Sequence, residues 1–213
     1  MSQTIAGIPI PDSQLAREAT DLVRDTESPL LFHHSRRVFL FGALTGRKKA
    51  LAFDPELLYI GAMFHDMGLV PPYSSATERF EVDSANAARD FLRGHGIAEA
   101  SIDIVWDAIA LHTTPGIPQH KKAEVALVTA GVEMDVLGLG FPNVSDHDRL
   151  QVVEAHPRGE HFKEGIVEAF YQGFRHKPDS TFGTVNDDVI AFKEPHFHRT
   201  DFCSMIQHSA WPT

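Results

Sequence analysis

Two histidines and two aspartates lie where apolar residues are expected. The run LLYIGAMFHDMGLV, residues 57–70, is almost wholly apolar, yet it holds His65 and Asp66 side by side. His34 and Asp135 fall on the apolar stripes of two other predicted helices. A buried carboxylate without a partner is costly because its hydration is lost. One cation could satisfy all four side chains, so together they predict a divalent metal site.

The alternative is that each of these side chains is a separately hydrogen-bonded polar group of the core. That arrangement needs an independent partner for every buried group, whereas one cation serves them all, so the metal site is favoured. Cys203 is the only cysteine, which excludes an intrachain disulfide and a zinc site built from thiolates. The metal ligands must therefore be His, Asp or Glu.

Helical periodicity and end signals place these candidates on separate helices. The helices expected to position them span residues 28–46 with His34, residues 54–68 with His65 and Asp66 in the last turn, and residues 121–137 with Asp135. Further helices are expected over residues 12–28, 83–96, 101–112 and 159–176, with a short one near 201–207 and loops elsewhere after Pro178. Strand signals are scarce. The sequence predicts a single all-α domain over residues 1–213, a helical bundle around one buried metal site with its core at about 28–176 and an irregular C-terminal extension.

Composition limits the classes of function. The chain has 213 residues with 43% apolar content, enough for one domain with a sizeable core. Its 19 Lys and Arg against 29 Asp and Glu disfavour nucleic-acid binding, because phosphate neutralisation needs clustered basic residues. No apolar run approaches the ~18 residues of a membrane span, and the N-terminus lacks a signal-peptide pattern. We therefore expect a cytoplasmic protein that acts on a small-molecule substrate, without nucleic-acid or membrane partners.

Aromatic residues leave the oligomeric state open. Phe39, Phe41 and the segment around Trp211 could contribute to an interface in a homo-oligomer. A location in the core would explain these residues equally well.

The ordered set of four residues resembles the H…HD…D signature of the HD superfamily of metal-dependent hydrolases. His34 lies in FHHSRRVFLFG, His65 and Asp66 in FHDMG, and Asp135 in VTAGVEMDVLG. The segments FEVDSANAARDFL, AIALHTTPGIP, HPRGEHFKEGI and DFCSMI are similar to the cyanamide hydratase-like branch, so the resemblance covers about residues 28–208. It implies a helical protein with one metal, zinc in the hydratases, which add water to cyanamide to make urea. It also selects His34 rather than His33 as the ligand, because His34 precedes the Ser-x-Arg-Val of the family pattern.

The resemblance to binuclear members of the superfamily is incomplete. Phe80 stands where those proteins have a histidine, and Ser84-Ala85 replaces a Gly-Ala pair, whereas His112 in IALHTT does match. We therefore expect one divalent metal per chain, zinc first, with iron or manganese also compatible with His and Asp ligands. A binuclear iron oxygenase is a further hypothesis, which Phe80 weakens.

The chemistry expected of such a site is activation of water. A metal with an open coordination position lowers the pKa of its bound water toward ~7 and supplies hydroxide at neutral pH. Besides Asp66, the candidates for catalysis are His112, Glu81 and Asp83 as general acids or bases. Each has a structural alternative, because His112 could be a hydrogen-bonded core residue, Glu81 could be solvated, and Asp83 could cap a helix.

Three functions follow, in order of preference. The first is hydration of a small nitrile-like substrate, with cyanamide to urea as the best guess. The second is phosphohydrolysis of a nucleotide or another phosphate ester, for which cations besides the metal would be needed. The candidate cations are Arg36, Arg37, Arg79, Lys121 and Lys122, which also suit a solvated helix face. The third is a non-catalytic HD domain that serves as an interaction module.

Overall fold

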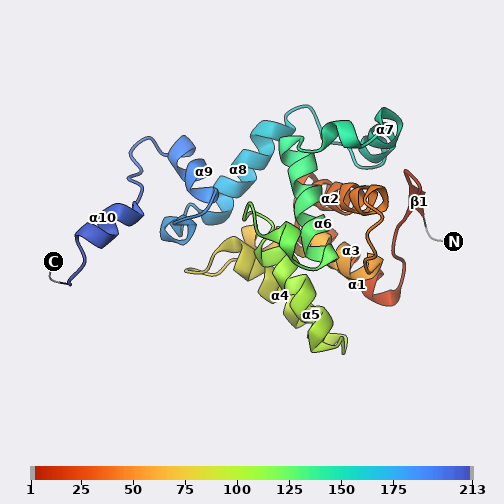
Figure 1. Cartoon of the computed structure of the whole chain (residues 1–213), viewed down its shortest axis with the longest axis horizontal. Helices are drawn as coiled ribbons and strands as arrows, with labels where there is room; N and C mark the ends of the chain where they lie inside the picture. The colour runs from red at the N-terminus through yellow and green to blue at the C-terminus, as the bar shows by residue number, and fades with distance from the viewer. Residues whose placement is uncertain (1–2, 212–213) are drawn as a thin grey trace.

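Helices make up nearly all of the regular structure in residues 3–211, the part of the chain that the computed structural model describes (Figure 1). The α-helices are α1 (Gln14–Thr26), α2 (Pro29–Lys48), α3 (Pro55–Phe64), α4 (Phe80–Gly94), α5 (Glu99–Ala110), α6 (Ala123–Val132), α7 (Asp146–Ala155), α8 (Phe162–Phe174), α9 (Asn186–Lys193) and α10 (Phe202–Gln207). Short 3-10 turns are η1 (Met67–Leu69), η2 (Pro118–His120), η4 (Phe141–Asn143) and η5 (Pro178–Thr181), and η3 (Glu133–Leu137) is a π-helical turn. An antiparallel hairpin of β1 (Thr4–Ile5) and β2 (Ile8–Pro9) precedes α1. The predicted all-α helical bundle is confirmed.

Side-chain caps fix the starts of the first three helices. Ser13, Ser28 and Asp54 each accept hydrogen bonds from backbone N–H groups in the first turn of the helix that follows. Pro29 and Pro55 begin α2 and α3, where a proline costs no intrahelical hydrogen bond. The predicted starts of the two helices that lead to His34 and His65 are therefore confirmed.

Helix α3 ends earlier than the sequence pattern predicted. His65 flanks its C-terminus and Asp66 follows it, so the prediction that both lie in the last helical turn is wrong. The chain turns directly into η1, where a Cβ on Gly68 would lie 2.1 Å from the carbonyl oxygen of Phe80. This close approach requires glycine, and it holds the chain after Asp66 directly against α4.

Other elements also differ from the predictions. Helix α4 begins three residues before Asp83, and α6 ends at Val132, so that Asp135 lies in the π-helical turn η3. The hairpin, α7 and α9 were not predicted. In α7 only Val152 is buried, so the sequence carries too weak an apolar stripe to reveal a helix.

The core lies where α2 crosses α6, with α3 and α5 packed around the crossing. A Cβ on Gly131 of α6 would lie 2.1 Å from the carbonyl oxygen of Val38, and one on Gly42 of α2 would lie 2.6 Å from that of Leu127. The two backbones therefore touch without intervening side chains. Because His34 lies on α2 and η3 continues α6, this crossing also sets the distance between His34 and Asp135.

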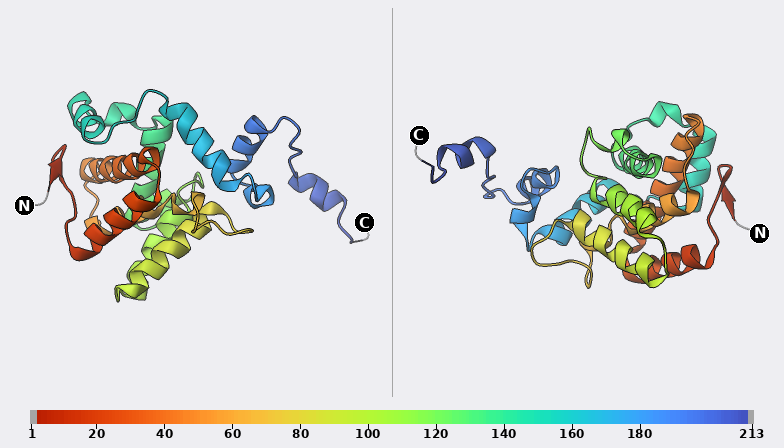
Figure 2. Two further views of the ribbon diagram at one scale, coloured as in Figure 1. Left: turned by 180° about the vertical axis from the view of Figure 1, so that it is seen from behind. Right: turned by 60° about the horizontal axis from the view of Figure 1, so that its bottom comes forward.

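A second, smaller apolar cluster attaches α8 and α9 to this core. Its buried members are Leu31, Leu69, Phe80, Phe162, Ile166, Phe174 and Ile190. Helix α10 instead lies away from the other helices in every view (Figures 1 and 2). No helix among residues 3–211 has the length and apolar character needed to cross a membrane.

The aromatic residues considered for an interface fall into two groups. Phe39 and Phe41 are buried in the core, as the alternative interpretation held. Trp211 is 85% exposed, and Phe202, Met205 and Ile206 of α10 are exposed with it. A homo-oligomer formed through this segment stays a prediction.

Substitution of Gly131 by Ala is expected to lower the free energy of unfolding by about 1–3 kcal/mol, because the added methyl group pushes α2 and α6 apart. Urea denaturation followed by circular dichroism measures the change. Gly94→Ala is the matched control, since a Cβ there meets nothing within 4 Å. We expect this control to be neutral or slightly stabilising. Equal stability of the two variants would contradict the close crossing.

Candidate metal centre

Three imidazole rings direct the same nitrogen atom toward Asp66. His34, His65 and His112 come from α2, from the end of α3 and from the turn after α5, and all three are buried. The Nε2 atoms of His34 and His65 lie 3.7 and 3.3 Å from Oδ2 of Asp66, and Nε2 of His112 lies 3.9 Å from Oδ1. The Nε2 atoms of His34 and His65 are 3.2 Å apart. The structure thus brings these four predicted residues together.

Backbone carbonyl groups fix the orientation of two of these rings. Nδ1 of His65 lies 2.7 Å from the carbonyl oxygen of Ala62, and Nδ1 of His112 lies 2.6 Å from that of Ile109. A carbonyl oxygen can only accept a hydrogen bond, so each Nδ1 carries a proton and donates it. In the neutral rings Nε2 is then left with a free lone pair, which is the form that binds a metal.

Asp135 lies at the opposite edge of the His34 ring from the cluster. Its Oδ2 accepts a hydrogen bond from Nδ1 of His34 at 2.6 Å. Arg37 donates to both carboxylate oxygens at 2.8 and 2.9 Å, and Arg158 donates to Oδ1 at 2.5 Å. Asp135 therefore orients His34. Carboxylates commonly do this in metal sites, where they accept a hydrogen bond from the imidazole nitrogen that does not bind the metal. Its predicted role as a direct ligand stays a prediction.

Asp66 is the residue that most clearly requires a cation. Its side chain is 0% exposed, and neither carboxylate oxygen accepts a hydrogen bond from any residue in the described range 3–211. A buried ionised carboxylate needs compensation, which here can come only from the neighbouring imidazole rings or from a bound cation. Ligand atoms of His34, His65 and Asp66 all lie within 4.8 Å of one another, so these residues fit one divalent cation. His112 lies beside them as a further nitrogen donor.

The surroundings keep most of these groups in the form that binds a metal. Burial raises the pKa of Asp66, but His65 and His34 outweigh it and lower that pKa to about 2. Burial lowers the pKa of His112 to about 4, and it also lowers the pKa of His34, where Asp135 opposes it. Burial likewise acts to lower the pKa of His65, but Asp66 raises it above its usual value.

Phe80, at the position where binuclear relatives are expected to have a histidine, contributes no ligand atom. Its ring centroid lies 5.6 Å from that of His112, and it stacks against Phe174 of α8. An aromatic ring thus fills the space beside His112. This packing is compatible with the prediction of one metal.

Glu81, predicted as a general acid or base, is fully buried and held by three donors. Arg79 donates to it at 3.0 Å, Asn186 donates at 2.9 Å, and the hydroxyl of Thr113 also donates to it. The alternative that Glu81 is solvated is therefore wrong. These bonds connect α4 to α9 and to the turn after α5, and a role for Glu81 in proton transfer stays a prediction.

Asp83 does not cap α4, contrary to the structural alternative considered for it. It accepts hydrogen bonds from the backbone and hydroxyl of Ser75 at 2.9 and 3.0 Å, and it forms an ion pair with Lys177 at 2.6 Å. Lys177 follows α8, so this pair fastens the 71–79 loop and the C-terminal helices to α4. A role for Asp83 in proton transfer likewise stays a prediction.

Two buried charged residues near the centre were missed by the sequence analysis as parts of the site. Arg37 was considered only as a phosphate contact, although it lies three residues after His34 and therefore shares a helix face with it. Glu27, just after α1, is buried and leaves Oε1 without a partner among the described residues. Burial raises the pKa of Glu27 well above its usual value, and the charge of Asp66 adds to the effect. No local pattern around Glu27 signals its burial.

Replacing Asp66 by Asn is expected to abolish stoichiometric metal binding, because the ligand charge is lost. Plasma mass spectrometry after metal loading and dialysis measures the metal content. Asp25→Asn, at an exposed carboxylate, is the control and should bind metal like the unchanged chain. Full metal content in Asp66→Asn would show that the centre lies elsewhere.

Asp135→Asn is expected to weaken metal binding by about 10- to 100-fold without abolishing it, because the charge that orients His34 is removed while the ligands remain. Competition titration with a chromophoric chelator measures the dissociation constant. A loss of binding as complete as that of Asp66→Asn would identify Asp135 as a direct ligand.

Comparison with known families agrees with this geometry. Residues 31–136 match the model of the HD domain, a range that contains His34, His65, Asp66 and Asp135. No curated protein matches the chain, and the finer similarity to the cyanamide hydratase-like branch has no support from these comparisons. Residues 31–136 are therefore an HD domain, the domain of a superfamily of metal-dependent hydrolases.

Proposed function

We propose that this protein is a metal-dependent enzyme that adds water to a small neutral substrate of the nitrile class, with cyanamide to urea as the first reaction to test. The observation that carries this proposal is the enclosure of the centre. His34, His65 and Asp66 are 0% exposed and His112 is 3% exposed. An enclosed centre favours a substrate of few atoms over a nucleotide.

The charges around the centre support the same choice. Arg37 and Arg158 are both paired with Asp135, and Arg79 is paired with Glu81. A phosphate ester would need cations that are free to contact its oxygens. Phosphohydrolysis, the activity suggested by the wider superfamily, is therefore the second candidate.

His34, His65 and Asp66 would hold the metal. A divalent cation in such a site supplies Lewis acidity that lowers the pKa of a coordinated water toward ~7. The protein contributes orientation, because Asp135 fixes the ring of His34 and the carbonyl oxygen of Ala62 fixes the ring of His65. Zinc is our first expectation for the metal, ahead of iron and manganese.

His112 is our candidate for proton transfer. Its Nδ1 is engaged with the carbonyl oxygen of Ile109, so Nε2 is the atom that can take up a proton near Asp66. Hydration of a nitrile carbon places an oxygen on carbon and requires a proton on nitrogen. A neutral imidazole beside the centre can accept the proton that water loses and return it to that nitrogen.

The test is product analysis with metal-loaded protein. Urea release from cyanamide is expected, with no phosphate released from nucleoside monophosphates. Phosphate release without urea would contradict hydration and support phosphohydrolysis, the second candidate function. Stoichiometric metal with neither product would contradict both proposals and favour a non-catalytic interaction module.

His112→Ala is expected to keep its metal and to lose about 100-fold or more in turnover, because the proton-transfer group is removed. Metal analysis and the urea assay on the same preparation separate these two effects. His120→Ala, at an exposed histidine, is the matched control and should leave both unchanged. Loss of metal in His112→Ala would show instead that His112 is a ligand.

A further inference from the structure

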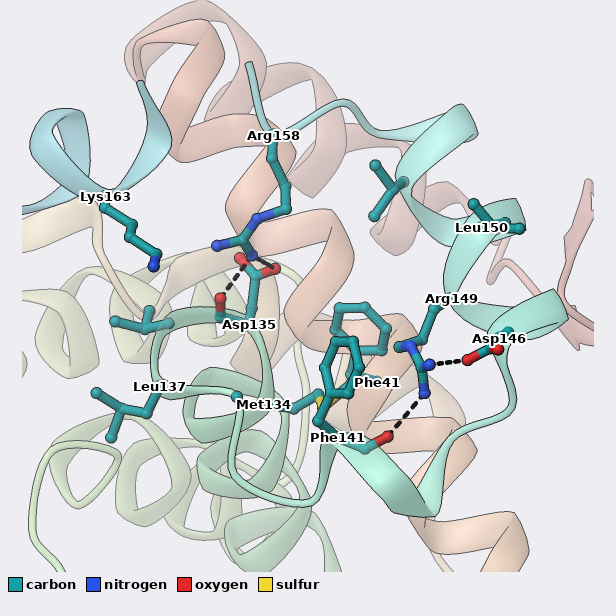
Figure 3. Close-up of a pocket in the computed structure, with 13 residues that line it drawn as sticks. Phe41, Met134, Asp135, Leu137, Phe141, Asp146, Arg149, Leu150, Arg158 and Lys163 are labelled. Carbon is teal, nitrogen blue, oxygen red and sulfur yellow. Dashed lines mark hydrogen bonds and ion pairs between the residues drawn. The ribbon is translucent and has the colours of Figure 1, made fainter. Parts of the chain in front are cut away.

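A cavity of about 670 Å³ lies beside Asp135 and is lined by η3, α7 and the start of α8 (Figure 3). Asp135 contributes to its wall, whereas His34, His65 and Asp66 do not. The volume falls in the range of small-molecule sites. The cavity is therefore distinct from the metal centre but adjoins the residue that orients His34.

The charged side chains of this cavity leave one cation without a partner. Arg158 is paired with Asp135, and Arg149 is paired with Asp146. Lys163 forms no hydrogen bond or ion pair with any residue between 3 and 211, and Figure 3 shows its ammonium group directed toward the Arg158–Asp135 pair. Three positive and two negative groups thus leave one positive charge facing the cavity.

The remaining wall is apolar and unusually open to solvent. Leu137, Phe141 and Leu150 are 67%, 50% and 69% exposed, and all three line this cavity. Phe41 and Met134 are buried and also contribute to its wall. A concave apolar surface with a few charged groups that fix orientation is typical of a small-molecule site. Exposed apolar side chains gathered at one place indicate a surface that a ligand covers.

We propose that this cavity binds an amphipathic monoanion, such as an aliphatic or aromatic carboxylate. The anionic group contacts Lys163 and the outer face of Arg158, and the apolar body packs against Phe41, Phe141 and Leu150. Binding at this cavity needs neither metal nor turnover and is therefore independent of the proposed function. Arg158 also donates a hydrogen bond to Asp135, which in turn orients His34. A ligand bound in the cavity would therefore contact a residue that is connected to His34 through hydrogen bonds.

Isothermal titration calorimetry of the metal-free full chain with octanoate tests the proposal. Saturable binding of one octanoate is expected, with 1-octanol and inorganic phosphate each binding about tenfold more weakly, because one lacks the charge and the other lacks the apolar body. Absence of saturable octanoate binding would overturn the proposal. Phosphate binding as tight as octanoate binding would also overturn it, since the site would then recognise charge alone.

Two variants at exposed positions locate the bound probe. Lys163→Gln should weaken octanoate about tenfold and leave 1-octanol unchanged, whereas Leu150→Ser should weaken both. Lys122→Gln removes an exposed lysine outside this cavity and is the matched control. Unchanged octanoate binding in both Lys163→Gln and Leu150→Ser would place the probe elsewhere and contradict the proposal.

Discussion

The buried carboxylate of Asp66 is the constraint on which the rest of the centre depends. No N–H or O–H group among residues 3–211 donates to it, and the nitrogen atoms that face it come from rings whose protons are engaged at their opposite edges. Such a charge costs several kcal/mol unless it is compensated. A bound cation compensates it and at the same time uses the lone pairs of the surrounding Nε2 atoms. The arrangement therefore suits a bound cation.

Backbone packing provides the position of this carboxylate. The close approach of Gly68 to α4 fixes the chain just after Asp66, and the crossing of α2 and α6 at Gly131 fixes His34 relative to Asp135. The first contact joins consecutive elements, η1 and α4, whereas the second joins helices that are far apart in the sequence. The geometry of the centre thus follows from two places where backbones touch, and small changes there would move the ligand atoms.

The charged residues around the centre form a supporting layer. Asp135 accepts a hydrogen bond from Nδ1 of His34 and is itself held by Arg37 and Arg158. The hydrogen bonds of Glu81 and the ion pair of Asp83 attach the C-terminal helices to α4. These helices and the smaller apolar cluster enclose the centre, which explains why its residues are hidden from solvent. Enclosure in turn favours a small substrate, so the contacts that stabilise the fold also restrict the size of the substrate.

The sequence predicted the helices that carry the metal ligands, but it did not predict which residues those helices contact. His34, His65 and Asp66 were recognisable because polar residues on apolar stripes are rare, and Ser28 and Asp54 marked the helix starts. The end of α3 was misplaced, since the approach of Gly68 to α4 is a tertiary contact with no local signal. The bond between Glu81 and Asn186 joins residues 105 positions apart, and α9 itself was not predicted. Periodicity identifies the face of a helix that is buried, but it does not identify what that face contacts.

The most direct test of the proposed metal centre is a crystal structure of the zinc-loaded protein with an anomalous difference map. One anomalous peak per chain is expected, bonded to Nε2 of His34, Nε2 of His65 and the carboxylate of Asp66, with Asp135 still bonded to Nδ1 of His34. A peak at any other place, or no peak in protein shown to contain zinc, would contradict the proposed centre.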